Sequence, residues 1–340
     1  MSDRLLSKYR SELMGAAMLW VMLFHAFDLD LGAGVLNAFR AAGFGGVDIF
    51  IVLSAMGLVM SLDRRDQSYG DFLARRMRRI LPAYFTVMLP YTLFQIFYYG
   101  VPWSSLVWNS TLLYYWVHCA GAFNWYVAGI MLFYALTPPC LRFLRGREHR
   151  ARTAALGIAL SVAVCQLLMQ EGYWQYVDVF YRVPLFFLGL LLGIYLVEDK
   201  PFGKKDAAFW TVWLLCGVVY GAHVYRDGGT LGAIHTPLCH LFLFTTVPLC
   251  LIGCALFEKL PLGAVRRALR FVGERSLEIY LLNVSVFCEI TLLRRFVHFG
   301  PSNRLYFLIM FALNIALGAA LHRGIAFAGA KKNDQNTMKA

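Results

Sequence analysis

The sequence predicts an all-α membrane protein, a polytopic bundle of about ten transmembrane helices with both termini in the cytoplasm. Three observations predict this class. Of the 340 residues, 59% are hydrophobic and only 15% are charged, whereas soluble domains carry about 25% charged residues. Apolar stretches of roughly 20 residues, long enough to span a bilayer, recur along the whole chain. The alternation of polar and apolar residues that is typical of an outer-membrane barrel does not occur.

The apolar stretches predict one membrane domain, residues 1–330, followed by a cytoplasmic tail, residues 331–340. The segment 101–120 is rich in Trp and Tyr. Because these side chains favour the headgroup zone, the segment predicts an interfacial helix or a shallow re-entrant element, with an eleventh span as the alternative. The predicted spans lie near residues 13–27, 43–62, 80–99, 123–141, 153–170, 181–197, 207–225, 237–257, 275–293 and 304–327.

Lysine and arginine set the predicted orientation of these spans. The net charge of +12 would suggest nucleic-acid binding in a soluble protein. In this topology, however, 25 Lys and Arg residues fall on the side of the termini and six on the other. Cytoplasmic loops carry such an excess. We therefore predict cytoplasmic termini, an even number of spans, contact with a lipid bilayer and no nucleic-acid partner.

Motifs that would indicate other chemistries are missing from the sequence. The eight cysteines lack C-x-x-C spacing and lie mostly in apolar runs, so neither a disulfide framework nor a zinc site is predicted. There is no P-loop, no nucleophile elbow and no H-E-x-x-H motif. We therefore expect no metal and no ATP-driven transport through a P-loop.

A histidine and an aspartate lie in the first two predicted spans. His25 lies in the outer part of the first span, and Asp48 lies about five residues into the second, so the two can share a similar depth. Ionisable groups inside spans are costly and usually face an interior cavity. One interpretation is that His25 acts as a general base oriented by Asp48. The alternative is a pair that only holds two helices together.

Four arginines precede the third predicted span: Arg75, Arg76, Arg78 and Arg79. The forked guanidinium group matches phosphate oxygens, so this segment is a candidate binding site for a phosphate-rich cytosolic ligand. The alternative is an ordinary positive-inside signal that contacts anionic lipid.

Other polar side chains lie in the outer halves of the predicted spans or near their middle. We expect them to bind a substrate in the same cavity as His25, because such groups usually face an interior cavity. For Arg182, the alternative is a pairing with Asp178 or Glu171 at the interface. The candidates are Asn124, Trp125, Arg182 and Asn283.

Taken in order, these segments resemble the acyltransferase 3 family of bacterial integral membrane acyltransferases. The resemblance covers nearly the whole chain, and its most specific features are a first-span histidine, a G-V-D second span and an R-x-x-R-I-x-P entry to the third. The matching segments are LWVMLFHAF (19–27), GGVDIFIVLSAMGLVMSL (45–62), FLARRMRRILPAY (72–84), NWYVAGIMLFYALTP (124–138), YRVPLFFLGLLLG (181–193) and FVGERSLEIYLLNV (271–284).

The resemblance implies about ten membrane helices and an O-acetyltransferase-like activity in the bacterial cytoplasmic membrane. The donor would be cytosolic acyl-CoA, commonly acetyl-CoA, and the acceptor a hydroxyl of an extracytoplasmic or envelope glycan. His25 matches the essential first-span histidine of the family, and Arg76 and Arg79 match its R-x-x-R pattern.

Two positions depart from the family pattern. The family often has an arginine eleven residues before the histidine; this chain has Met14 there, and its nearest arginine is Arg10. The family often ends its ninth-span motif with histidine, where this chain has Asn283. Both departures suggest a diverged branch of the family, and Asn283 weakens any proton relay through the ninth span.

Two other function classes fit the same polar residues. A transporter or flippase of a lipid-linked or exported saccharide could bind its substrate at mid-membrane without acyl chemistry. A sensor or assembly subunit that has lost activity would neither bind nor turn over acyl-CoA. Release of free thiol from acyl-CoA separates the transferase from both.

Overall fold

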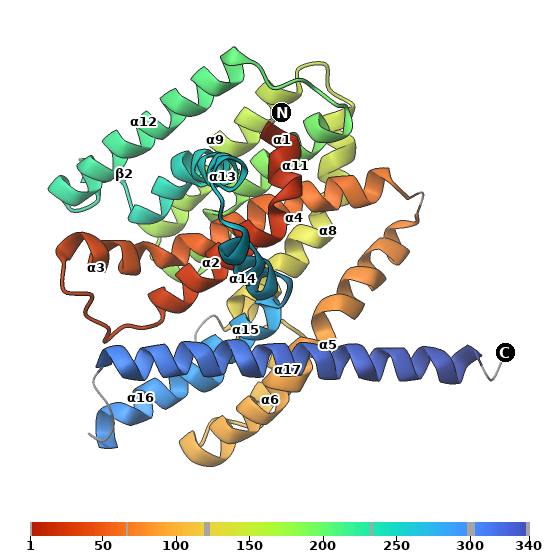
Figure 1. The fold of residues 1–340 in the computed structure, drawn as a ribbon, viewed down its shortest axis with the longest axis vertical. Helices are drawn as coiled ribbons and strands as arrows, with labels where there is room; N and C mark the ends of the chain where they lie inside the picture. Colours follow the sequence, from red (N-terminus) through yellow and green to blue (C-terminus); the bar gives the residue numbers. More distant parts are fainter. Residues whose placement is uncertain (1, 66, 119–122, 232–233, 298–302, 338–340) are drawn as a thin grey trace.

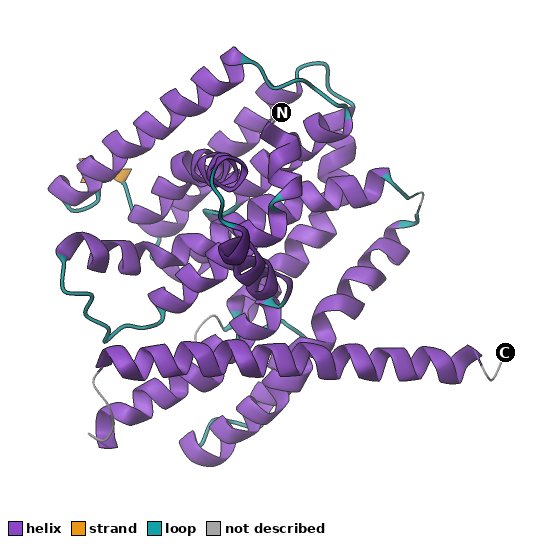
Figure 2. Ribbon diagram, viewed as in Figure 1, coloured by secondary structure: helices purple, strands orange, loops and turns teal. Residues whose placement is uncertain are grey.

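The computed structural model describes residues 2–65, 67–118, 123–231, 234–297 and 303–337, and helices make up most of them (Figure 1). Strands β1 (Thr230–Leu231) and β2 (Ile234–His235) form one small antiparallel pair within this part of the chain (Figure 2). The predicted all-α class is confirmed.

Over the described residues, nine helical stretches are long and apolar enough to cross a membrane, and they coincide with nine of the ten predicted spans. Their elements are α4 (Gly46–Asp63), α5 (Tyr69–Tyr99), α8 (Trp125–Arg145), α9 (Arg150–Gln170), α11 (Val183–Val197), α12 (Lys204–Asp227), α13 (Leu241–Lys259), the series α15 (Ser276–Leu282), η3 (Asn283–Phe287) and α16 (Cys288–Val297), and α17 (Asn303–Thr337). The other helices are α1 (Ser2–Lys8), α2 (Arg10–Phe24), α3 (Gly34–Ala41), η1 (Ala42–Gly45), α6 (Ser104–Ser110), α7 (Tyr114–Val117), α10 (Trp174–Phe180), η2 (Leu238–His240) and α14 (Gly263–Glu274).

The tenth predicted span, 13–27, corresponds to α2, which has the same length, 15 residues, but begins and ends three residues earlier. Only Tyr9 separates α2 from α1, and the Tyr9 N–H bond to the Leu5 carbonyl and the Leu13 N–H bond to the Tyr9 carbonyl continue the helical pattern across it. The helix packs against α4, α14 and α15, and Ala17, Met18 and Met22 are fully buried. Neighbouring helices therefore enclose much of α2.

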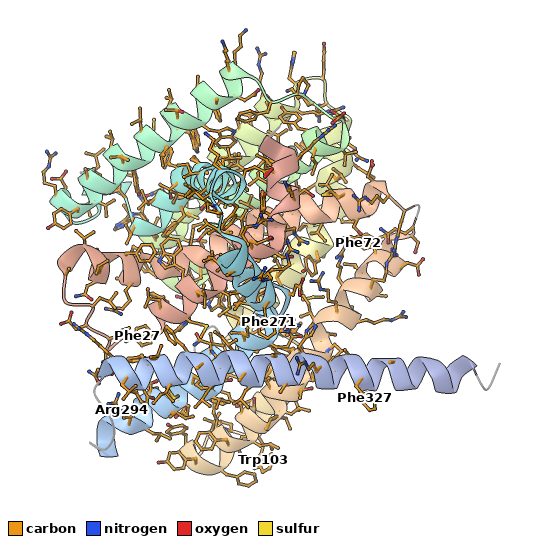
Figure 3. The ribbon with its side chains drawn as sticks, viewed as in Figure 1. Phe27, Phe72, Trp103, Phe271, Arg294 and Phe327 are labelled. Carbon is orange, nitrogen blue, oxygen red and sulfur yellow. The ribbon has the colours of Figure 1, made fainter. Side chains whose placement is uncertain are left out.

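The Trp- and Tyr-rich segment after α5 contains only short helices, α6 and α7. Neither is long enough to cross a bilayer, so an eleventh span is not found among the described residues; positions 119 and 120 of the segment lie outside them. Trp103, just before α6, is 60% exposed (Figure 3). The segment therefore fits the expected interfacial element.

Helix α4 is the centre of the bundle and packs against α2, α8, α11 and α13. Its closest partner is α11, where Gly189 and Gly193 form a G-x-x-x-G pair. A side chain at Gly189 would collide with the backbone of Val52, and one at Gly193 with Val59. Small residues of this kind let two membrane helices approach closely enough to pack backbone against backbone.

Helix α14 occupies a segment that the topology treats as a loop, 258–275. It crosses α2 through one glycine on each helix, Gly15 and Gly273. A Cβ at Gly15 would overlap the carbonyl oxygen of Leu269, and one at Gly273 would overlap that of Ser11. The contact between these two helices therefore depends on both glycines.

Ion pairs join the segments that the charge count assigns to one side of the membrane. All of them are partly or largely exposed, so each contributes little to stability, but together they place these segments at one end of the bundle. The pairs are Arg4–Asp199, Lys8–Glu258, Arg145–Asp63 and Arg150–Glu198. That this end is cytoplasmic remains a prediction.

The glycine crossing predicts a strong effect of Gly15→Val. The added side chain has no space against Leu269, so we expect a loss of about 1–3 kcal/mol in stability, the usual cost of overpacking. Thermal unfolding in detergent measures it. Gly324→Ala, at a helical glycine with open space around it, is the matched control and should unfold with the wild type or slightly later. Equal unfolding of all three proteins would contradict a close α2–α14 contact.

Candidate active site

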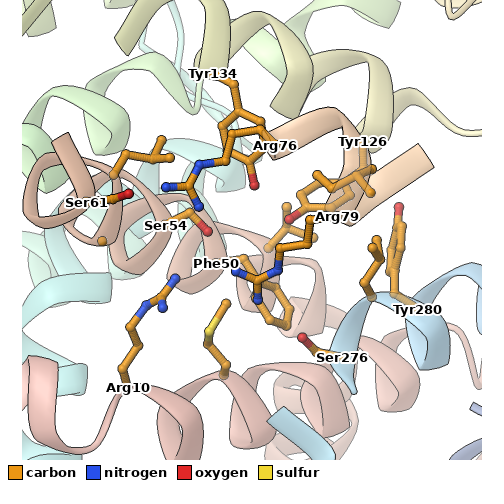
Figure 4. A pocket seen from close by; sticks show the side chains of 16 residues that line it. Arg10, Phe50, Ser54, Ser61, Arg76, Arg79, Tyr126, Tyr134, Ser276 and Tyr280 are labelled. Atoms are coloured by element: carbon orange, nitrogen blue, oxygen red, sulfur yellow. The ribbon is translucent and has the colours of Figure 1, made fainter. Parts of the chain in front are cut away.

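A cavity of about 200 Å³ opens between α2, α4, α5, α8 and α15 (Figure 4). Three arginines from two of these helices point their guanidinium groups into it, and no acidic side chain lines it. We call it the arginine cavity. Its polar lining consists of Arg10, Ser54, Ser61, Arg76, Arg79, Tyr126, Tyr134, Ser276 and Tyr280.

A backbone contact positions Arg10 in this cavity, and no acidic side chain among the lining residues neutralises the three arginines. Arg10 Nε donates to the carbonyl oxygen of Leu53 at 3.1 Å, and its guanidinium crosses α4 at Gly57, which has no side chain to block it. Arg76 Nε is buried without a hydrogen-bond partner. Three like charges repel one another in a partly desolvated space, so the cavity favours a ligand with several negative charges.

The arginines near the start of α5 differ in whether their side chains line the cavity. Ser68 caps this helix by accepting from the backbone N–H of Asp71 at 3.1 Å, and residues three apart then share a face. Arg76 and Arg79 share the cavity face. Arg75 lines a neighbouring groove that also contains Arg10, Arg76, Arg64 and Arg65. Arg78 and Arg79 are both exposed, but Arg79 lines the arginine cavity and Arg78 lines neither space.

His25 follows the last residue of α2 and lines a second, small cavity, the histidine cavity. Its Nδ1 lies 2.8 Å from the carbonyl oxygen of Val21. A carbonyl oxygen only accepts, so Nδ1 carries the hydrogen and Nε2 is left as the proton acceptor. The other lining residues include Met22, Asn283, Thr291, Phe307 and Met310.

The expected pairing of His25 with Asp48 is wrong. Asp48 is fully buried and faces Arg182, with 3.8 Å between Oδ1 and Nε, and neither carboxylate oxygen has a hydrogen-bond partner. Counting residues matched the depth of the two groups but left open which way each helix turns its side chain. The Val21 carbonyl therefore orients His25, while Asp48 balances the charge of Arg182.

Arg182 lies in a buried cage rather than at a binding surface. Its guanidinium carbon is 4.5 Å from the ring centre of Trp125 and 4.2 Å from that of Tyr181. Its remaining contacts are to the backbone carbonyl oxygens of Asp178 and Phe44. The predicted alternative, pairing at the interface with the side chain of Asp178 or Glu171, is therefore also wrong.

The substrate-binding candidates divide into two groups. Asn124 caps α8 by accepting from the Val127 N–H at 2.9 Å, and together with Trp125 and Arg182 it lies outside both cavities. These three side chains stabilise helices instead. Only Asn283 lines the histidine cavity. The sequence reasoning missed the tyrosines Tyr126, Tyr134 and Tyr280, because apolar helices carry many tyrosines that only pack.

A protein-family model described as an acyltransferase domain, acyltransferase 3, matches residues 15–323. The chain belongs to the acyltransferase 3 family. It is an acyltransferase and an integral, multi-pass membrane protein. No curated protein and no solved structure matches it.

Both cavities of this acyltransferase lie along the same two elements. On α2, Arg10 and Met14 line the arginine cavity and His25 lines the histidine cavity, and Met14 and His25 are about 16 Å apart along the helix axis. In the α15 series, Tyr280 lines the first cavity and Asn283 the second. The same two elements therefore contribute to the walls of both cavities.

The structure also accounts for Met14 in this acyltransferase. Residues four apart lie on one face of a helix, so Arg10 reaches the same cavity that Met14 lines. Arg10 therefore brings a positive charge to the cavity one turn before the position at which the family resemblance implies an arginine.

The Asp48–Arg182 geometry predicts the results of single and double substitutions. Asp48→Leu leaves an uncompensated buried arginine and should cost about 3–5 kcal/mol. The double variant Asp48→Leu with Arg182→Met removes both charges and should regain most of that loss, together with acyl transfer. Thermal unfolding and activity measure the two effects. A double variant that folds fully but transfers nothing would instead give Asp48 or Arg182 a part in the chemistry.

Proposed function

We propose that this acyltransferase transfers an acyl group, first of all acetyl, from cytosolic acyl-CoA to a hydroxyl of an extracytoplasmic or envelope glycan. The observation that carries the proposal is the uncompensated arginine cavity, joined along α2 to a histidine whose Nε2 is free to accept a proton. The acetyl group and the glycan rest on the family resemblance, and the site is the bacterial cytoplasmic membrane.

The positive charge of the arginine cavity is the reason for placing the acyl-CoA donor there. Coenzyme A carries a diphosphate and a third phosphate, and bidentate arginine contacts suit each of them. Arg10, Arg76 and Arg79 would hold phosphates in the cavity, and Arg64, Arg65 and Arg75 of the adjoining groove extend the positive surface. The ion-paired end of the bundle would face the cytosol, because its segments hold most of the basic residues.

The position of His25 is the reason for placing the acceptor hydroxyl at the other end of α2. The residue ends α2 at the opposite end of the helix from Arg10, so an acceptor from outside the cell would meet it first. Its Nε2 would take the proton of the acceptor hydroxyl while the oxygen attacks the acyl carbonyl carbon. The imidazolium would then return that proton to the departing CoA sulfur.

Removal of the base tests the chemical step. We expect His25→Ala to fold normally and to lose at least about 10²-fold in rate, the usual contribution of a general base. The assay measures thiol release from acetyl-CoA by purified protein in lipid, with and without an envelope-glycan extract. Release that requires the extract and His25 supports transfer to a glycan.

Two outcomes would overturn the assignment. Retained transfer by folded His25→Ala protein would remove the base role from His25. A wild-type protein that releases no thiol under any condition would contradict the acyl-CoA donor and leave transport or a lost activity.

The arginine cavity predicts a change in donor affinity. Replacing Arg76 and Arg79 with Gln removes two charge-assisted contacts, each worth about 1.5–3 kcal/mol, so the dissociation constant for acetyl-CoA should rise at least 10-fold. The loss should shrink at high salt, because screening weakens the wild type first. Arg78→Gln, from the exposed face of the same helix, is the control and should bind as the wild type. Equal affinity of all three proteins would leave the arginines as topology signals.

A further inference from the structure

Two asparagines lie at matching positions on the η3 segment and on α17. Two contacts fix the antiparallel register of these helices. Near one end, Gly318 lies directly against the backbone of Ile279. Near the other, Thr291 Oγ1 and the Tyr306 hydroxyl are 3.1 Å apart. Four residues outward from the first contact, on both helices, this register places Asn283 opposite Asn314.

Both amides are buried and incompletely bonded. Asn283 is 4% exposed and Asn314 is 1% exposed. Asn283 Oδ1 has no hydrogen-bond partner, and neither polar atom of the Asn314 side chain has one. A buried amide without partners lowers stability, and an apolar side chain of similar size would avoid that cost. The structure of the resting protein therefore gives no reason for an amide at position 314.

Asn283 lines the histidine cavity, and Asn314 lies beside it. Asn283 shares this cavity with His25. Met310 and Phe311 also line the histidine cavity, and Asn314 is one turn from both on the same face of α17. Both positions are therefore next to the space that His25 lines.

The backbone changes at the same point. Residues Asn283–Phe287 form a π-helical turn between α15 and α16. Such turns are rare and occur frequently at functional sites. Here the turn begins at the asparagine that lines the histidine cavity.

We propose that Asn283 and Asn314 form an oxyanion site, in which their amide N–H groups donate to the carbonyl oxygen of the acyl thioester. The inference rests on the proposed function and adds the group that stabilises the developing charge. An asparagine amide can turn its NH₂ group toward an acceptor. Preorganised donors in a dry site are worth more than donors in water.

With this site, acyl transfer proceeds through a tetrahedral intermediate. The acceptor oxygen forms a bond to the carbonyl carbon while His25 Nε2 takes the hydroxyl proton, and the carbonyl electron pair moves onto the oxygen that the two amides hold. Collapse of this intermediate breaks the carbon–sulfur bond, and the thiolate takes the proton from His25. The products are the ester and free CoA.

The test is Asn314→Leu in the acetyl-CoA assay. We expect kcat to fall about 10²–10³-fold, as for other lost oxyanion donors, with affinity for acetyl-CoA within about threefold of the wild type. Unfolding should occur at the same or a higher temperature, because an unpaired buried amide has been removed. Asn314→Gln keeps an amide and should recover part of kcat. Asn314→Ala, which only removes atoms, replaces the leucine variant if that fails to fold.

Ser285→Ala is the matched control. Ser285 is fully buried on the same π-helical turn, but its hydroxyl already donates to the Leu281 carbonyl oxygen at 2.6 Å, so kcat should stay at the wild-type value. A folded Asn314→Leu protein with wild-type kcat, beside an inactive His25→Ala protein, would overturn the oxyanion site alone. No thiol release by the wild type would overturn the proposed function itself.

Discussion

Polar groups inside a bilayer must be enclosed by protein, and in this acyltransferase α4 makes that enclosure possible. It packs against α11 through Gly189 and Gly193, and on its other sides against α2, α8 and α13. Its side chains contribute to the wall of the arginine cavity, and its Asp48 balances Arg182. Without this central helix, neither the arginine cavity nor the buried ion pair would be shielded from lipid.

Two kinds of arginine occur in this protein, and they differ in whether a carboxylate lies beside them. Arg182 has a carboxylate, two aromatic rings and backbone carbonyls around it. Arg270 likewise pairs with the buried Glu12 at 2.6 Å. Arg10, Arg76 and Arg79 share a cavity with no acidic side chain. A compensated charge holds helices together, whereas an uncompensated group of charges is the arrangement expected of an anion-binding site, as proposed for these three arginines.

The sequence predicts the fold well because length and apolar composition decide which segments cross a bilayer. It also identifies His25, Arg76 and Arg79, each of which lines a cavity. It fails where rotation about a helix axis matters, since equal depth does not bring Asp48 to His25. The sequence also does not predict contacts between segments that are far apart along the chain. It gives no sign that Asn314 on α17 lies opposite Asn283, or that α14 crosses α2 where Gly273 meets Gly15. Such contacts join segments whose spacing along the chain carries no signal.

The junction of α1 and α2 has a consequence for the helix that carries both Arg10 and His25. Tyr9 alone separates the two helices, and the bonds from the Tyr9 N–H to the Leu5 carbonyl and from the Leu13 N–H to the Tyr9 carbonyl continue the helical pattern across it. Leu6 and Tyr9 are buried, so protein encloses this end of α2 as well. A displacement of α1 would therefore reach Arg10 along a nearly continuous helix rather than through a flexible loop.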